Sequence, residues 1–395
     1  MKLKRNLLSA ALVVGASATL AAGAQAAGTT VSEAGSTLVY PLVQNWSTNF
    51  GILTGNPVTT QAVGSGAGIQ NVCTGITNIG ASDAPLGFPG VKICQPSGGS
   101  ATTQSGSYAA NYVEVPWALS ATDMIYKIPV AGGHYITNGL KLSASDLVGI
   151  YTGKITKWSQ LQSQQYTTKR VHGKVKKVAL FKYKLPATKI TPVYRSDGSG
   201  DSYAFTNFMS KASSSWNRQY GPTTSFPTSA NSAAVGESGN SGVASEVEQV
   251  PGAIGYVSNY YSIEVLNSGQ NVGIAQVVNA AGNAEYPNVA NISAAAASIT
   301  KPPAQNSGST KFFGMAVQYP TKKFAAAYPI STYTYAIVAR NAGPAASTIQ
   351  SFLNYAVSKN FDGSTGGLNV GLTIGFAPLP ASVQAYDLNV IKLIK

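Results

Sequence analysis

Histidine and cysteine are scarce in this sequence of 395 residues, which contains two of each: His134, His172, Cys73 and Cys94. Neither histidine lies at ligand spacing from a cysteine or from the other histidine, so no metal site is expected. The scarcity also bears on catalysis, because a serine nucleophile needs a base and a phosphatase typically needs a cluster of metal ligands. We therefore expect neither a metal nor a cofactor, and an enzyme is the weaker class of hypothesis for this chain.

Long apolar runs are also missing, and no stretch offers the roughly 20 unbroken apolar residues that a membrane span requires. The N-terminus combines basic residues, an apolar stretch and small residues ahead of Ala27, which is the layout of a cleaved signal peptide spanning residues 1–26. We therefore expect export to the periplasm, with an extracellular location as the alternative. No cysteine follows this leader, so a lipid anchor is not expected there.

An exported chain meets conditions that permit disulfides, and Cys73 and Cys94 are the candidates for a bridge. We expect them to be joined, since closing a loop of this size stabilises a fold by about 3 kcal/mol in the chain-entropy model. Two independent buried thiols are the alternative.

Charged residues are few, at 10% of the chain, and acidic residues are the rarer kind. Without the three basic residues of the leader, 24 of the 27 basic residues remain against 14 acidic ones, a net charge of +10. This charge indicates anionic partners or small anions, and solubility alone is the other explanation. Nucleic acid is not expected as a partner, because no aromatic-interleaved RNA motif or basic recognition helix is present.

Three places share one layout, in which a short β-rich run breaks into Gly and Ser before a helix-patterned segment. They are GTTVSEAGST before LVYPLVQNWSTNF, PVTTQAV before GSGAG, and KITPVY before RSDGSGDSYAF. Strands that alternate with helices through short Gly-rich turns predict an α/β fold with largely parallel sheets. The first helix carries an apolar stripe at Val39, Val43, Trp46 and Phe50.

These junctions also predict a binding site. A helix N-terminus presents free backbone N–H groups and the positive end of the helix dipole, and such junctions gather at the carboxyl ends of strands. Three of them together are suited to one anion site, whereas three ordinary N-caps are the alternative. Arg195 is the natural anchor for the anion and Asp197 its supporting partner. Asp83 would accept a hydrogen bond from a protonated anion and repel a fully ionised one such as sulfate.

A basic stretch near residues 165–190 stands out in the middle of the chain. From Lys169 to Lys189 there are eight Lys or Arg residues and no acid, and the run alternates around a turn at His172 and Gly173. The pattern predicts a surface hairpin. Its charge is that of a solvated face, with attraction of anions or docking to an acidic surface as the alternative.

Six segments together resemble a known family, in order and at similar spacings. They are AGSTLVYP, AVGSGAG, IGASDAPL, LVGIYTGKITKW, YRSDGSGDSYAF and GNSGVASEVEQVPGAIGYV, and the resemblance runs from about Gly35 to the end. The chain resembles the periplasmic phosphate-binding proteins that serve the high-affinity phosphate ABC importer. The resemblance implies a two-lobed, class II periplasmic-binding-protein fold, with two mixed sheets flanked by helices and phosphate in the cleft between the lobes. It also implies a monomer without enzymatic activity that delivers phosphate to membrane permease subunits.

The resemblance carries site residues over by position. It implies phosphate contacts from one set of residues, with Asp197 in support: Thr37, Leu38, Ser65, Asp83, Arg195, Ser199, Gly200 and Asp201. Two positions depart from the family pattern, because the family usually has phenylalanine at Leu38 and threonine at Asp201. The Asp201 side chain either turns towards the N-terminal turn of its own helix or faces the ligand as a second proton acceptor.

The resemblance further implies that the chain crosses twice between lobes. Lobe one would hold residues 27–117 and 332–395, and lobe two residues 118–331 with the basic insertion near 165–190. Two alternatives to import remain from the sequence. One is an exported phosphohydrolase that uses the same oxyanion cradle, and the other is a surface or extracellular phosphate-binding protein not coupled to import.

Overall fold

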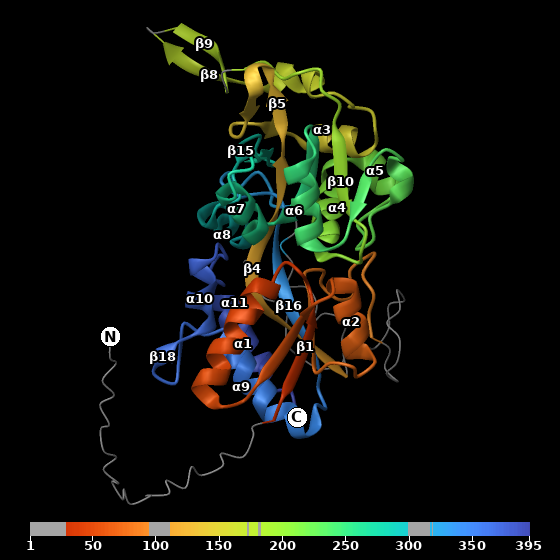
Figure 1. Cartoon of the computed structure of the whole chain (residues 1–395). Coiled ribbons are helices and arrows are strands. Elements are labelled where there is room, and N and C mark those ends of the chain that lie inside the picture. Colours follow the sequence, from red (N-terminus) through yellow and green to blue (C-terminus); the bar gives the residue numbers. More distant parts are fainter. Residues whose placement is uncertain (1–28, 95–110, 172–173, 181–182, 299–316, 318) are drawn as a thin grey trace, which may run out of the picture.

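The computed structural model describes residues 29–94, 111–171, 174–180, 183–298, 317 and 319–395. The leader predicted at residues 1–26 lies outside this part of the chain. The described strands form one long path, in the order β11-β10-β12-β4-β16-β3-β1-β2, with β13 also paired to β4. Helices flank both ends of this path, which gives the elongated two-lobed shape of Figure 1. The described helices include none that is long and apolar enough to cross a membrane.

The first lobe contains three parallel strands from the N-terminal part of the chain and one antiparallel strand from its C-terminal part. Its strands are β1 (Val31–Gly35), β2 (Val58–Ala62), β3 (Ile79–Ser82) and β16 (Ser331–Ala339). β1 pairs in parallel with both β2 and β3, and β16 pairs antiparallel with β3. The helices of this lobe are α1 (Tyr40–Thr54), α2 (Ser65–Cys73), α9 (Ala346–Ala356), α10 (Gly367–Thr373) and α11 (Ala381–Ile391).

The second lobe repeats this layout with a different segment of the chain. Its strands are β10 (Thr191–Arg195), β11 (Val235–Glu237), β12 (Ala253–Ser258) and β13 (Gly273–Ile274), and β10 pairs in parallel with β11 and β12. Its helices are α3 (Ala144–Tyr151), α4 (Gly200–Ala212), α5 (Ser214–Gln219), α6 (Gly239–Gln249), α7 (Asn259–Asn267) and α8 (Val289–Ala296). Both halves therefore contain mixed sheets, as the sequence predicts.

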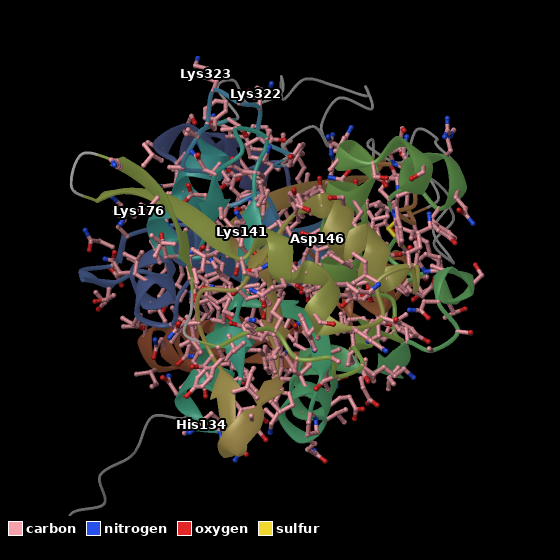
Figure 2. All side chains as sticks on the ribbon, turned by 90° about the horizontal axis from the view of Figure 1, so that it is seen from above. His134, Lys141, Asp146, Lys176, Lys322 and Lys323 are labelled. Atoms are coloured by element: carbon pink, nitrogen blue, oxygen red, sulfur yellow. A yellow bond between two sulfur atoms is a disulfide. The ribbon has the colours of Figure 1, made fainter. Side chains whose placement is uncertain are left out.

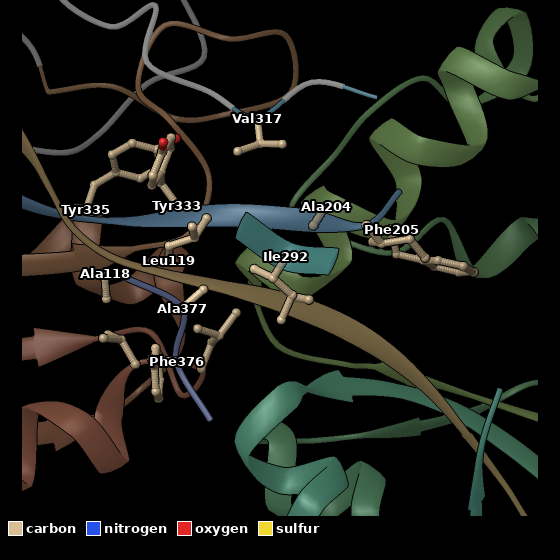
Figure 3. Packing of buried hydrophobic residues seen from close by; sticks show 14 of the residues in the cluster. Ala118, Leu119, Ala204, Phe205, Ile292, Val317, Tyr333, Tyr335, Phe376 and Ala377 are labelled. Atoms are coloured by element: carbon tan, nitrogen blue, oxygen red, sulfur yellow. The ribbon is translucent and has the colours of Figure 1, made fainter. Parts of the chain in front are cut away.

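One strand is shared by the two lobes. β4 (Tyr112–Tyr126) pairs antiparallel with β16 over residues 112–121 and with β12 over residues 122–126. All of its residues are buried, because neighbouring strands and helices cover it along its whole length. Figure 3 shows Leu119 of β4 and Tyr333 of β16, which are paired across the two strands. The two sheets are thus continuous through a single buried strand.

Short elements surround this frame. They are β5 (Ile128–Val130), β6 (His134–Ile136), β7 (Lys141–Leu142), β14 (Gln276–Val278), β15 (Ala284–Glu285), β17 (Asn360–Phe361) and β18 (Ser364–Thr365). The predicted basic hairpin is confirmed as β8 (Tyr166–Val171) and β9 (Lys174–Ala179), which pair only with each other among the described strands. It projects from the end of the second lobe in Figure 1, and Figure 2 shows Lys176 upon it.

The apolar stripe predicted for α1 forms part of the first-lobe core. Val39, Val43, Trp46 and Phe50 are fully buried. Trp46 meets Trp117 of β4 edge to face, with ring centroids 5.4 Å apart. The predicted disulfide is confirmed as well, since Cys73 at the end of α2 is bonded to Cys94. The bridge holds the end of α2 to the segment that follows β3.

Candidate anion-binding site between the lobes

The three predicted strand-to-helix junctions meet in the structure, where the lobes face each other. The amide of Gly66 in α2 donates to the carbonyl of Gly198 before α4, at 2.9 Å. The amide of Gly200 donates to Ser65 Oγ at 3.1 Å. Small residues are required for this approach, because a β-carbon at Gly64 would lie 2.5 Å from an Asp197 carboxylate oxygen. The N-termini of α2 and α4 are therefore in direct contact across the two lobes.

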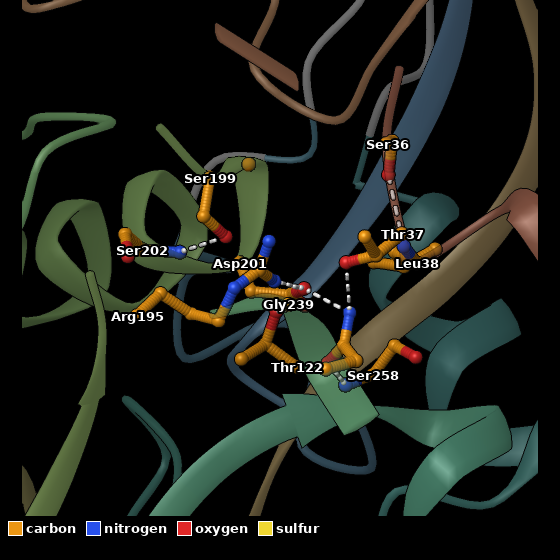
Figure 4. Close-up of polar contacts among 12 residues, drawn as sticks. Ser36, Thr37, Leu38, Thr122, Arg195, Ser199, Asp201, Ser202, Gly239 and Ser258 are labelled. Carbon is orange, nitrogen blue, oxygen red and sulfur yellow. Dashed lines mark hydrogen bonds and ion pairs between the residues drawn. The ribbon is translucent and has the colours of Figure 1, made fainter. Parts of the chain in front are cut away.

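On the first-lobe side, serine hydroxyls surround Asp83. Ser36 Oγ lies 2.6 and 2.5 Å from the two carboxylate oxygens, and Ser65 Oγ lies 3.2 Å from Oδ2. The Leu38 amide donates to Ser36 Oγ at 3.0 Å, which ties the start of α1 to the same group. Asp83 is buried, with 1% of its surface exposed. Figure 4 shows Ser36, Thr37 and Leu38 on this side of the junction.

On the second-lobe side, Arg195 ends β10 and is as deeply buried as Asp83. Its Nε and one terminal nitrogen donate to the two oxygens of Asp197, at 2.6 and 2.5 Å. Its other terminal nitrogen donates to Asp201 Oδ2 at 3.1 Å. The predicted pairing of Arg195 with Asp197 is thus present, and a second carboxylate joins it. These are the ion pairs found within the described residues.

The Asp201 carboxylate accepts hydrogen bonds from three other elements, on the second-lobe side of the junction. Thr122 Oγ1 of β4 donates to its Oδ1, and Asn240 Nδ2 of α6 donates to its Oδ2, each at 2.8 Å. The interpretation that this side chain turns towards the N-terminal turn of its own helix is therefore wrong, because β4, β10 and α6 engage both carboxylate oxygens. The same Asn240 nitrogen donates to Thr37 Oγ1 at 2.8 Å, as the dashed lines of Figure 4 show. Asn240 thereby joins Asp201 to the first lobe.

Ser199 acts as the N-cap of α4. Its Oγ accepts a hydrogen bond from the Ser202 amide at 3.2 Å, and the side chain is buried. His134, the histidine within the described residues, lies exposed on β6 and stacks on Tyr183, at the rim of the second lobe in Figure 2. His172 lies outside the described residues. Among the described residues, no group of three or more His, Cys, Asp or Glu side chains is arranged to hold a metal ion.

Burial and charge set the protonation of this network. Burial raises the pKa of Asp83 to about 8, the negative charge of Asp201 adds to the rise, and the serine hydroxyls and Arg195 oppose it. Burial also raises the pKa of Asp201, against the opposing charge of Arg195. Asp197 differs, because its bonds to Arg195 outweigh burial and lower its pKa. Bonds to Arg195 therefore favour the ionised form of Asp197, whereas burial shifts Asp83 and Asp201 towards their protonated forms.

Four residues of this network were not predicted from the sequence. They are Ser36, Thr122, Gly239 and Asn240, and Gly239 donates its amide to Asp197 Oδ1 at 3.0 Å. A signal for Gly239 and Asn240 exists, because β11 followed by a Gly-Asn-Ser-Gly run and α6 repeats the layout of the other three junctions. Ser36 stands beside the predicted Thr37. Thr122 lies inside a long strand, where no local pattern distinguishes it.

Comparison with known proteins gives a consistent family relationship. Residues 20–360 match the model of a PBP superfamily domain. The phosphate-binding protein PstS of Xylella fastidiosa (strain 9a5c) is 30% identical over 317 residues, which cover 80% of this chain and 73% of the relative. The corresponding protein of Methanocaldococcus jannaschii is 27% identical over 341 residues, covering 84% of this chain and 77% of the relative.

A solved structure supports the fold itself. The phosphate-binding protein of Stenotrophomonas maltophilia superposes with a TM-score of 0.60 at 18% identity, covering 92% of this chain and 94% of that one. This similarity, together with the family match, confirms the two-lobed α/β periplasmic-binding-protein fold that the sequence predicts.

Proposed function

The chain belongs to the family of the phosphate-binding proteins PstS, within the PBP superfamily, and we propose from this premise that it binds inorganic phosphate between its lobes for ABC import. The observation that carries the proposal is the position of Arg195. This buried guanidinium bonds to Asp201 in the first turn of α4, whose N-terminus meets that of α2, and its charge acts on Asp83 of the opposite lobe. A permanent positive charge with converging helix N-termini is an anion site by its physical chemistry.

Each predicted residue has a role in this proposal. Arg195 supplies the charge and Asp197 fixes the plane of its guanidinium through two hydrogen bonds. The hydroxyls of Thr37, Ser65 and Ser199 and the amides of Leu38, Gly200 and Asp201 would be the donors for the phosphate oxygens. The Leu38 and Gly200 amides would exchange their bonds to Ser36 and Ser65 for bonds to the ion. These groups come from both lobes, so closing the lobes around the ion would complete its shell of hydrogen bonds.

Asp83 provides selectivity in the same proposal. A carboxyl group whose pKa is raised to about 8 carries or shares a proton at neutral pH, and a bound phosphate can share that proton with it. Sulfate has no proton to share, so above about pH 8, where Asp83 is ionised, it would face the carboxylate as a like charge. The site should therefore accept phosphate and reject sulfate.

We place the protein in the periplasm, as a monomer that delivers phosphate to the permease subunits of the importer. Residues 27–117 with 332–395 would form one closing lobe, and residues 118–331 the other. We also propose that it is not an enzyme, because Ser199 Oγ serves as the cap of α4. Incubation with a chromogenic phosphate ester should then release no more phosphate than buffer alone. Turnover that Ser199→Ala abolishes would favour the hydrolase instead.

Isothermal titration tests the proposal directly. Wild-type protein, freed of any bound ion by unfolding and refolding, should bind one phosphate tightly, and a large excess of sulfate should leave that titration unchanged. Arg195→Ala should abolish binding, whereas Arg218→Ala, a control on the exposed face of α5, should not change it. Normal phosphate binding by Arg195→Ala would show that Arg195 does not bind the ion. If sulfate competed with phosphate equally, Asp83 would not provide the proposed selectivity.

A further inference from the structure

The network at the lobe junction has an unusual balance of charge. Arg195 is its one basic side chain, and three carboxyl groups surround the same place: Asp83, Asp197 and Asp201. Asp197 already pairs with Arg195 through two hydrogen bonds. An entering anion therefore meets a guanidinium whose charge is compensated, together with two further carboxyl groups.

Asp201 and Asp83 both adjoin Gly200. A β-carbon at Gly200 would lie 2.4 Å from Asp83 Cβ, so the backbone at the start of α4 rests directly on that carboxyl side chain. Asp201 is the next residue, and its charge raises the pKa of Asp83. The two acidic groups are therefore near neighbours that cannot both be ionised without mutual repulsion.

Other charged and titratable groups around Asp201 do not offset this balance. β4 contributes Asp123, β12 contributes Tyr256 and α7 contributes Tyr261, and the Asp201 charge disfavours the ionised form of each. The neutral partners are Thr122 and Asn240, which donate hydrogen bonds without adding charge. Arg195 is the one basic group among all of these neighbours.

Asp201 has acceptor capacity left for a ligand. An ionised carboxylate offers about four acceptor positions, and the described contacts use two on Oδ2 and one on Oδ1. A phosphate hydroxyl could therefore donate to Oδ1. Asp83 offers the same chemistry from the other lobe, so two phosphate hydroxyls would find two acceptors.

We propose that the site takes phosphate as the singly charged dihydrogen ion, and that Asp201 is the residue that imposes the second proton. The inference rests on the proposed phosphate binding and specifies its substrate form. Dihydrogen phosphate brings one negative charge and two O–H donors, one for Asp83 and one for Asp201. Hydrogen phosphate brings two charges and one donor, which leaves one carboxylate facing a like charge.

The test is phosphate titration from pH 4.5 to 9 with wild type, Asp201→Thr and Asp201→Asn. Above about pH 8, where free phosphate and Asp83 have each lost a proton, wild-type affinity should fall about tenfold per pH unit, the slope of one required proton. Both variants should lose most of that slope and bind about tenfold or more tighter than wild type at pH 9. At pH 4.5 the three proteins should differ little. Asp362→Asn, which removes an exposed carboxylate, is the control and should follow wild type.

Proton counting provides a second readout that does not depend on the variants. Titration of wild type at pH 8.5 in two buffers of different ionisation heat should show net proton uptake on phosphate binding. A flat wild-type affinity between pH 6 and 9, no proton uptake, or superimposable profiles for wild type and Asp201→Asn would each overturn the inference. Absence of phosphate binding at every pH would overturn the proposed function instead.

Discussion

The backbone of Gly200 rests on the carboxyl side chain of Asp83, so that an added β-carbon would lie 2.4 Å from Asp83 Cβ and 2.5 Å from its Oδ2. Gly200 opens helix α4 of the second lobe, and Asp83 follows strand β3 of the first. The two lobes are therefore in direct contact at this point. The contact also gives a direct way to separate lobe closure from the chemistry of the individual side chains.

Gly200→Ala should weaken phosphate binding about tenfold or more, because overpacking a close contact costs about 1–3 kcal/mol. The helical backbone at this position accepts alanine, so the effect should come from the contact across the lobes. Gly51→Ala in α1 is the matched control, since the nearest atom to its β-carbon is 3.8 Å away. Titration of both variants with phosphate checks the expectation. Equal affinity of the two variants would contradict it.

Asn240→Asp should weaken phosphate binding about tenfold or more at pH 8, since each 1.4 kcal/mol lost is a factor of ten. The amide nitrogen of Asn240 donates to both Thr37 and Asp201, and a carboxylate in its place would repel Asp201 instead. Part of the loss should be recovered at pH 5, where the new carboxyl group is more often protonated and can donate. Phosphate titration at both pH values measures this.

Asn389→Asp adds the same charge on the exposed face of α11 and is the control for that experiment. It should bind phosphate as wild type does at both pH values. Thermal unfolding of the two variants shows whether each is folded. An equal loss of affinity in both would mean that overall charge, rather than the link between Thr37 and Asp201, is responsible.

Buried carboxyl groups outside the Arg195 network should make the fold most stable in acid. The four whose pKa burial raises are Glu33, Glu114, Asp123 and Asp387, and the described residues provide none of them with an ion pair. Burial raises the pKa of Glu33 to about 8 and that of Asp387 well above its usual range. Folding thus favours the protonated form. The stability that each protonated carboxyl group contributes to the fold is complete below its ordinary pKa. It is lost as the pH rises through the pKa of the group in the folded protein, by about 1.4 kcal/mol per pH unit for each group.

Asp387→Asn should therefore raise the melting temperature at pH 8 by several degrees and change it little at pH 4. Neither Asp387 oxygen has a hydrogen-bond partner among the described residues, so the amide replaces a carboxyl group that gains nothing from its charge. Glu264→Gln, at an exposed position of α7, should leave the melting temperature unchanged at both pH values. A destabilised Asp387→Asn protein at pH 8 would show that the carboxylate has a stabilising partner.

The sequence predicts local features of this protein well, because neighbouring residues determine them. The stripe from Val39 to Phe50 has the period of a helix, and the turn between two basic runs sets the pairing of β8 with β9. Arg195 and Asp197 are two residues apart, so their ion pair is also a local feature. The bridge between Cys73 and Cys94 joined the two available cysteines of an exported chain.

The tertiary structure alone decided the partners of Asp201. Thr122 lies 79 residues from it in sequence, and the link between Asn240 and Thr37 spans 203 residues. No periodicity extends over such distances. Asp201 meets Thr122 and Asn240 only when the second lobe packs, and Asn240 meets Thr37 only when the two lobes come together. The sequence by itself determined the family, the helix junctions and the identity of the charged residues. The packing of the second lobe determined which way Asp201 points, because its bonds to Arg195, Thr122 and Asn240 outweigh any preference of its own helix.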